Sequence, residues 1–145
     1  MPEDSDGRRF LVANLGAARL GFDLNRITEV IPLARCARVP WGPAWLTGVI
    51  SHQGRLLNVV DLGAFLEVAE PTPCRVAAVV DRPALGLALA VGQVSIVDER
   101  HAVRVSELKF YLPRSDWVLE ALSTPETDFH HLDVDRVVEA IVENF

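Results

Sequence analysis

The fold is decided by the stretch Gly48-Val-Ile-Ser-His-Gln-Gly-Arg-Leu-Leu-Asn-Val-Val-Asp-Leu62. It has an apolar run at each end, and the small and polar residues between them supply what a tight reversal of the chain requires. Its second arm, residues 55–60, is too β-branched to favour a helix, so the stretch predicts a β-hairpin. Gly54 would supply a positive φ angle if the turn needs one. Asp61 is placed to cap a short helix that continues through Leu66.

Before this hairpin, the chain predicts three more strands. Residues 10–15 and 19–24 flank a Gly-Ala-Ala turn, and the second segment alternates between apolar and polar positions, which is typical of another hairpin. Residues 25–33 are rich in β-branched side chains and favour a strand, although the spacing of their apolar side chains also suits a helical turn. Residues 39–46 contain two prolines and two tryptophans, which predicts a packed loop or a single helical turn.

The chain is expected to form one domain over residues 9–145, behind a disordered N-terminal segment of residues 1–8. The stretch Glu70-Pro-Thr-Pro73 is predicted to be a linker, because its prolines disfavour helix and interrupt a strand ladder. It would divide the domain into two sub-barrels, about residues 9–70 and 74–132.

The end of the chain, residues 133–145, predicts an amphipathic helix, because apolar side chains recur on one helical face. We expect this helix to cover an open barrel edge, and the alternative is that its apolar face is an interface. The apolar positions are Val134, Val137, Val138, Ile141, Val142 and Phe145.

The second half of the sequence repeats the first in a degenerate form. A shift of 72 positions aligns the opening hairpin and its short helix with residues 121–138, and places Asp61 on Asp133. A shift of 65 aligns the earlier hairpin with residues 76–89. Both shifts keep the order hairpin, strand, loop, hairpin, helix, so we predict a duplication with two small barrels or curled sheets packed together. The alternative is chance matching of apolar residues. The second copy lacks the turn glycines, so its turn must be built differently.

Composition predicts a folded, soluble protein. Half of the 145 residues are hydrophobic and 23% are charged, which excludes a disordered chain. Twenty acidic and fourteen basic side chains give a net charge of −6, and the basic residues are scattered, which argues against nucleic-acid binding. The apolar runs are too short to span a bilayer and the first residues are acidic, so no membrane insertion and a cytoplasmic location are expected. Cys36 and Cys74 are expected to be free thiols.

No set of residues predicts catalysis or a cofactor. Zinc would need three or four Cys or His ligands at close spacing, but Cys36 and Cys74 stand alone. His130 and His131 adjoin in a predicted strand, where they would point to opposite faces. The sequence has no Gly-x-Ser-x-Gly elbow and no Gly-Lys-Ser/Thr phosphate loop. We therefore expect no metal, no cofactor and no enzymatic activity.

Two polar residues stand out from the solvated surface. Glu29 lies among the apolar side chains of a predicted strand, and Gln53 lies in the hairpin turn. A long side chain at the turn could cross back towards Glu29 and form a hydrogen bond with it. The alternative is that each is merely exposed.

Six segments share a pattern with a known family: Phe10-Leu-Val, Phe22-Asp-Leu, Ile27-Thr-Glu29-Val, Val39-Pro, Trp45-Leu-Thr-Gly48-Val-Ile and Gly54-Arg-Leu-Leu-Asn-Val-Val-Asp61-Leu. Together they resemble the signature of CheW, the bacterial chemotaxis coupling protein. The match has no gaps from about Ile27 to Leu62 and is looser over nearly the whole chain. The resemblance implies a mainly β fold of two small intertwined five-stranded SH3-like barrels, which agrees with the predicted duplication and is completed here by the C-terminal helix.

The resemblance also implies a non-catalytic adaptor. CheW proteins bind the cytoplasmic hairpin tips of methyl-accepting chemoreceptors and the regulatory domain of the histidine kinase CheA, and so build a signalling array; other CheW-like proteins are further expected partners. Receptor tips are thought to sit in an apolar groove between the two barrels, where a few buried aliphatic side chains would carry most of the binding energy. Motif matching assigns the receptor site to Ile27, Glu29, Val30, Gly48 and Val49, with Val91 and Val94 opposite, and the kinase interface or its turn to Gln53, Gly54 and Arg55.

The hairpin turn departs from the family pattern. Family members usually have Asn-Leu-Arg before the turn glycine, where this chain has Ser51, His52 and Gln53. The family arginine can pair with the glutamate that aligns with Glu29, so Glu29 is expected to have lost its cationic partner. A neutral hydrogen bond from Gln53 would be about half as strong as a charge-assisted one. Two alternatives follow: a divergent member that binds receptors but not the kinase, and, from another class, a sensor that binds a small molecule or peptide in a barrel mouth.

Overall fold

The computed structural model describes residues 8–33, 36–37, 40–68, 73–108 and 112–145. Several expectations fall outside these residues: the disordered segment 1–7, the Val39 position of the family motif and most of the predicted linker. Arg8, the last residue of the N-terminal segment, donates hydrogen bonds to Asp23 and Glu99, each at 3.0 Å.

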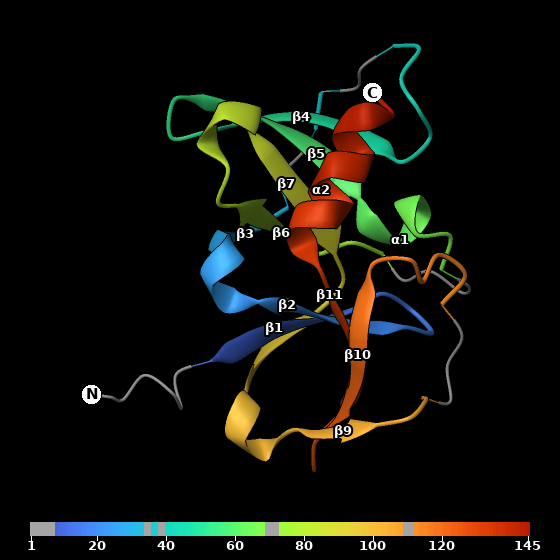
Figure 1. Cartoon of the computed structure of the whole chain (residues 1–145). Helices are drawn as coiled ribbons and strands as arrows, with labels where there is room; N and C mark the ends of the chain where they lie inside the picture. Colours follow the sequence, from blue (N-terminus) through green and yellow to red (C-terminus); the bar gives the residue numbers. More distant parts are fainter. Residues whose placement is uncertain (1–7, 34–35, 38–39, 69–72, 109–111) are drawn as a thin grey trace.

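The fold is mainly β, as predicted, with a helix at the C-terminus (Figure 1). The strands are β1 (Arg9–Asn14), β2 (Arg19–Asp23), β3 (Ile27–Pro32), β4 (Leu46–His52), β5 (Arg55–Asp61), β6 (Val76–Val80), β7 (Leu87–Val91), β8 (Val94–Asp98), β9 (Val103–Val105), β10 (Val118–Ser123) and β11 (Asp128–Leu132). The helices are α1 (Leu62–Phe65) and α2 (Val134–Glu143), with short 3-10 helices at Leu24–Arg26, Pro83–Leu85 and Glu99–His101.

The strands form two mixed sheets, one above the other in Figure 1. The six-stranded sheet has the order β8-β1-β2-β11-β10-β9, and the five-stranded sheet has the order β3-β6-β7-β5-β4. Each sheet therefore takes strands from both halves of the chain, which differs from the predicted division into sub-barrels at residues 70–74. The reason is that β2 pairs in parallel with β11, and β5 pairs in parallel with β7, so neither half completes a sheet alone.

The two sheets repeat one arrangement, which confirms the duplication. The six-stranded sheet is read from β8 and the five-stranded sheet from β3. In both, the first five strands pair in the same order of directions: antiparallel, antiparallel, parallel, antiparallel. The shift of 72 positions holds in detail, because the irregularity between Leu46 and Gly48 recurs between Val118 and Glu120. Chance matching of apolar residues does not account for a repeated bulge.

The helices obey the same shift. The Asp61 side chain accepts a hydrogen bond from the Ala64 amide and caps α1, and Asp133 accepts one from the Arg136 amide and caps α2. The amide of Asp61 donates to the carbonyl of Trp45 at 2.8 Å, and the amide of Asp133 repeats this bond to Trp117 at 2.9 Å. Both predicted helix starts are therefore confirmed.

The shift of 65 positions needs a correction. It aligns Leu20 with Leu85, but the strand registers place Leu20 opposite His130 and Leu87 opposite Asn58. Since Asn58 and His130 are equivalent under the shift of 72, Leu87 is the counterpart of Leu20. The error is two residues, which keeps every side chain on its predicted face because strand side chains alternate with a period of two.

The core has three parts. The largest cluster lies between the two sheets and includes the buried faces of both helices, while two smaller clusters lie on the other faces of the sheets. The five-stranded sheet encloses Ile31, Ile50, Leu57, Val59, Ala77, Val79, Ala88 and Ala90. The six-stranded sheet encloses Phe10, Val12, Val97, Leu122 and Phe129.

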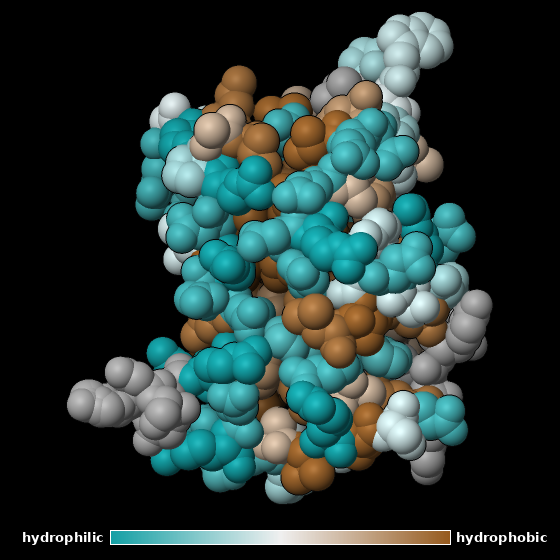
Figure 2. All heavy atoms as spheres, viewed as in Figure 1, coloured by the Kyte–Doolittle hydropathy of each residue, from teal (hydrophilic) through white to brown (hydrophobic). Residues whose placement is uncertain are grey.

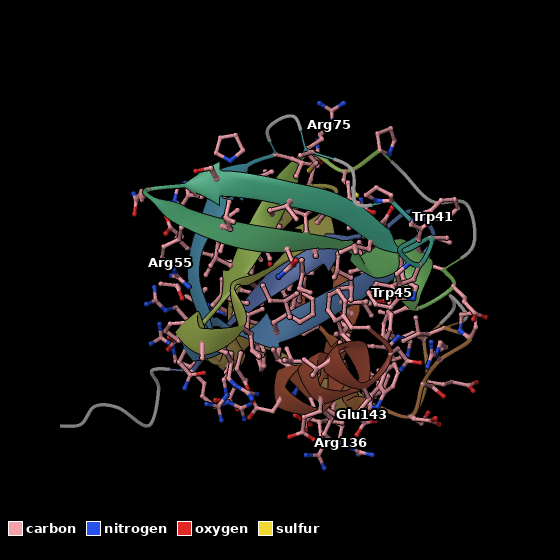
Figure 3. The ribbon with its side chains drawn as sticks, turned by 90° about the horizontal axis from the view of Figure 1, so that it is seen from above. Trp41, Trp45, Arg55, Arg75, Arg136 and Glu143 are labelled. Carbon is pink, nitrogen blue, oxygen red and sulfur yellow. The ribbon has the colours of Figure 1, made fainter. Side chains whose placement is uncertain are left out.

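The predicted packed loop before β4 buries only one of its tryptophans. Trp45 packs edge-on against Phe65 and Phe145, with ring centroids 5.1 and 5.5 Å apart. Trp41 is fully exposed and points away from the sheets in Figure 3. Trp45 therefore anchors the described part of this loop to the core.

Helix α2 is a structural part of the core rather than a detachable cover. Its Val134, Val137, Val138 and Ile141 side chains are buried between the sheets. Arg136 and Glu143 point away from the sheets in Figure 3. Val142 and Phe145, both predicted on the apolar face, are 44% and 57% exposed.

Replacing Ile141 by alanine should lower the free energy of unfolding by about 3 kcal/mol, because it leaves a cavity in the largest core cluster. The matched control Val142→Ala should cost less than about 1 kcal/mol, because that side chain is half exposed. Urea denaturation followed by tryptophan fluorescence would measure both. Equal losses would contradict the burial described for α2.

Candidate functional site

Gly48 and Val49 lie where the five-stranded sheet curls back on itself. Val49 exchanges both backbone hydrogen bonds with Ala37, each at 2.9 Å, and Ala37 follows the opposite edge strand β3. A Cβ atom on Gly48 would lie 2.5 Å from the Ala37 carbonyl oxygen. Glycine is therefore required at position 48 by the close approach of another backbone segment.

Glu29 and His52 join the same two edges through their side chains. Glu29 is on β3 and His52 is on β4, the outer strands of the five-stranded sheet, yet Oε1 of Glu29 and Nε2 of His52 are 3.2 Å apart. Both side chains are half-buried, on the sheet face that carries Ile50 and Ile31. The pair lies at one end of the small core enclosed by this sheet.

The partner of Glu29 is thus His52 rather than Gln53, which corrects the sequence prediction. Gln53 and Gly54 form the two-residue turn and have φ angles of 52° and 78°, so the Gln53 side chain leaves the strand alternation. His52 lies two residues after buried Ile50 and shares its face. The alternation of side chains along β4 places His52 on the same face as Ile50 and so indicates His52 as the partner of Glu29. The family pattern, which has its arginine at position 53, indicated Gln53 instead.

The tip of the β4–β5 hairpin is exposed. Gln53, Gly54 and Arg55, the predicted kinase-interface residues, are all exposed, and so is Leu56 at 71%. Nη2 of Arg55 donates to the Pro83 carbonyl at 2.8 Å and holds the hairpin against the segment before β7. An apolar side chain and a cation are therefore presented together at this tip.

The predicted receptor residues do not form one open groove. Ile27 is 9% exposed and Val91 is fully buried, both in the core between the sheets, and Val94 is half-buried against that core. Val30 is 36% exposed on β3, and Val49 is half-buried on β4. Val91 is thus a core residue, because it shares the face of β7 that carries Leu87 and Leu89 into the core between the sheets.

A second polar cluster lies in the six-stranded sheet. His131 is buried, and its ring nitrogens lie 3.0 Å from Oε2 of Glu120 and 3.1 Å from Oδ1 of Asp23. Arg8 pairs with Asp23, and Arg104 pairs with Glu120, each at 3.0 Å. The shift of 72 positions places Val59 and Gly48 at the sites of His131 and Glu120, so the five-stranded sheet has no such cluster there.

The charges of this cluster support one another. The hydrogen bond from His131, with that from Arg8, lowers the pKa of Asp23 to about 2 against the effect of burial. Burial alone would lower the pKa of His131, but its bonds to Asp23 and Glu120 outweigh burial and raise that pKa. Burial likewise opposes ionisation of Glu120, and its bonds to His131 and Arg104 lower its pKa nevertheless. Both ring nitrogens of His131 face carboxylates, and this arrangement favours the protonated form of the ring.

The described residues contain no group of three or more Cys, His, Asp or Glu side chains arranged to hold a metal ion. Cys36 and Cys74 are free thiols. Burial, together with the neighbouring charge of Asp61, raises the pKa of the Cys74 thiol to about 11, which opposes formation of a nucleophilic thiolate. Within the described part of the chain, no helix is long and apolar enough to cross a membrane.

On the face drawn in Figure 2, apolar side chains form small islands separated by hydrophilic ones. The most exposed apolar side chains are spread over several elements rather than gathered on one. They are Val30, Trp41, Leu56, Ile96, Val103, Leu119, Val142 and Phe145. Any partner would therefore be anchored by a few side chains at a time.

Comparison with known proteins gives a consistent result. A family model described as the CheW-like domain matches residues 9–141. The crystal structure of the scaffolding protein TtCheW from Thermoanaerobacter tengcongensis has a similar fold, with a TM-score of 0.68 and 17% sequence identity over 88% of this chain and 84% of that chain. No curated protein matches the sequence significantly.

Replacing Gly48 by alanine should destabilise the protein by about 3 kcal/mol, because the new Cβ meets a backbone oxygen that cannot move without breaking the Ala37–Val49 bridge. Gly54→Ala is the matched control: its φ angle is also positive, but no atom lies within 4 Å of the added Cβ. That change should cost about 1–2 kcal/mol. Chemical denaturation would compare them, and an equal loss in both would contradict a steric role for Gly48.

Stability should fall as the pH rises from about 7 to about 8. The folded-state pKa of His131 is raised, so its contribution is fully present below the unfolded value near 6.5 and is lost as the pH passes the folded value. Burial lowers the pKa of His130, which acts in the opposite direction but only at lower pH. Urea midpoints between about pH 7 and about pH 8, below the range in which the Cys36 and Cys74 thiols ionise in the unfolded chain, should decline in the natural protein and in His52→Gln, and remain nearly flat in His131→Gln. A decline of the same size in His131→Gln would contradict the assignment.

Proposed function

Because the chain belongs to the CheW-like domain family, we propose that it is a non-catalytic cytoplasmic adaptor, which couples chemoreceptor tips to a CheA-type histidine kinase in a chemosensory array. The observation that carries the proposal is the family match over residues 9–141. The likeness to a scaffolding protein agrees with it. No cofactor is required for such a role.

The receptor surface we propose is the strip where β3 approaches β4. Val30 and Val49 supply apolar contacts on one face of the sheet. Glu29 lies on the other face, where its contact with His52 holds the two edges together. Gly48 shapes the strip by allowing Ala37 to approach β4. A helical hairpin tip fits such a surface, since one or two aliphatic anchors are a usual means of docking a helix.

The buried members of the predicted site have a supporting role in this proposal. Ile27 and Val91 fix the two segments that cross between the sheets, and Val94 packs beside them. They set the position of β3 and β8 without reaching a partner. Substitutions there would act on folding before they act on binding.

The kinase surface we propose is the tip of the β4–β5 hairpin. Leu56 offers an exposed apolar side chain, and Gln53, Gly54 and Arg55 surround it. The tip carries the neutral Gln53 where the family usually has arginine, and this favours a second candidate: an accessory member that binds receptors without engaging the kinase normally. Other CheW-like proteins are further candidate partners for the same hairpin.

Immobilised protein should retain both a receptor signalling tip and the regulatory domain of a CheA-type kinase at micromolar concentrations. Val30→Arg should weaken receptor binding about tenfold or more, because it replaces a buried aliphatic contact with a charge. Leu56→Arg should weaken kinase binding by a similar factor, and Gln53→Arg should strengthen it. Surface plasmon resonance would measure each affinity.

Val103→Arg is the matched control, because Val103 is 64% exposed on β9 of the other sheet. It should leave both affinities unchanged. Retention of neither partner would refute the adaptor role. If the natural protein retains the receptor tip alone, and Gln53→Arg also retains the kinase domain, the protein is an accessory member that binds receptors without engaging the kinase.

A further inference from the structure

A cavity of about 150 Å³ opens at one end of the six-stranded sheet. Three of its side chains come from the β1–β2 hairpin, three from the segment that begins β8, and one from the turn between β10 and β11. They are Val12, Asn14, Arg19, Gln93, Val94, Ser95 and Thr127. Arg19 and Thr127 also line a wider hollow beside it, together with Thr124, Pro125, Glu126 and Asp128.

The duplication explains why this space is open. Ser95 lies opposite Val12 in the six-stranded sheet, as Glu29 lies opposite Val79 in the other. The shift of 72 positions likewise places Thr124 at the site of His52. The glutamate–histidine pair that fills this end of the five-stranded sheet is thus replaced by two small hydroxyl side chains.

The lining combines one cation with neutral donors over an apolar floor. Nε of Arg19 donates to the carbonyl of Asp128 at 2.9 Å, which holds the guanidinium between the two hollows. Oδ1 of Asn14 accepts from the Gly16 amide at 3.1 Å, so its amide nitrogen is the group oriented to donate elsewhere. Ser95 adds a hydroxyl, and Val12 is apolar. The carboxylates of Glu126 and Asp128 line only the outer hollow.

We propose that this cavity binds a carboxylate carried on a short aliphatic chain. The methylene groups would rest on Val12, and the carboxylate would face Arg19, Asn14 and Ser95. The carboxylate of the ligand would then occupy, in this sheet, the place that the Glu29 carboxylate occupies in the five-stranded sheet. It would be either a small free carboxylic acid or a glutamate side chain of a partner protein.

The net charge of −6 does not exclude an anionic ligand here. At physiological ionic strength, charges farther away than about 8 Å are largely screened, so the groups that line the cavity and the hollow beside it dominate. These are Arg19, which lines both, and the carboxylates of Glu126 and Asp128, which line only the outer hollow. An anion in the inner cavity is therefore favoured by direct hydrogen bonds from Arg19, Asn14 and Ser95 rather than by the net local charge. A charge-assisted hydrogen bond is roughly twice as strong as a neutral one, so the ionised acid is favoured over its amide.

The test is a titration of the ¹⁵N-labelled protein, followed by NMR, with butyrate and with its neutral analogue butyramide. Butyrate should shift the amide signals of Gln93, Ser95 and Thr127, and butyramide at the same concentration should not. A tripeptide, acetyl-Ala-Glu-Ala-amide, compared with its glutamine analogue, tests the partner source: a glutamate-specific shift identifies a protein side chain, and a response to butyrate alone identifies a free acid. Equal responses to acid and amide, or none to any probe, would overturn the proposal.

Variants locate the binding. Arg19→Gln should weaken the butyrate response about tenfold, and Ser95→Glu should abolish it by placing a carboxylate in the cavity from within the chain. Arg75→Gln, which removes an exposed arginine at the other sheet, should leave the response unchanged. Unperturbed signals elsewhere would show that each variant is folded. An Arg75→Gln effect as large as that of Arg19→Gln, or a full response in Ser95→Glu, would place the acid at some other site.

Discussion

The parallel pairing of β5 with β7, and of β2 with β11, is the interaction on which the rest of the structure depends. Each pair joins strands from opposite halves of the chain, so neither half has a complete sheet or a covered apolar face by itself. The largest core cluster forms only when both sheets and both helices are present. Folding of the two halves is therefore coupled, and the chain behaves as one domain despite its internal repeat.

This exchange of strands also positions the surfaces that we assign to partners. In the five-stranded sheet, β3 and β4 remain at the two edges, and the Ala37–Val49 bridge and the Glu29–His52 contact join them. Edge strands present side chains and backbone that inner strands cannot, and this makes them natural docking positions. The close approach at Gly48 keeps that edge from opening.

The two repeats have diverged in their polar groups while their backbones stay alike. The six-stranded sheet holds His131 between two carboxylates where the other has valine and glycine, and the five-stranded sheet holds Glu29 and His52 where the other has Ser95 and Thr124. A backbone frame tolerates such changes when each polar group finds a partner in its own sheet. One copy thereby has this end of its sheet filled by a polar pair, and the other retains an open cavity.

The sequence by itself determined the β-hairpins, the cap at Asp61, the helix at the end of the chain and the duplication, because these follow from local turn chemistry and side-chain periodicity. Only the tertiary structure decided which strands share a sheet, that Val91 is core, and that His52 rather than Gln53 meets Glu29. The cluster of Asp23, Glu120 and His131 was invisible for the same reason: its members are brought together from distant positions by strand pairing, and periodicity carries no information about which distant strands will pair.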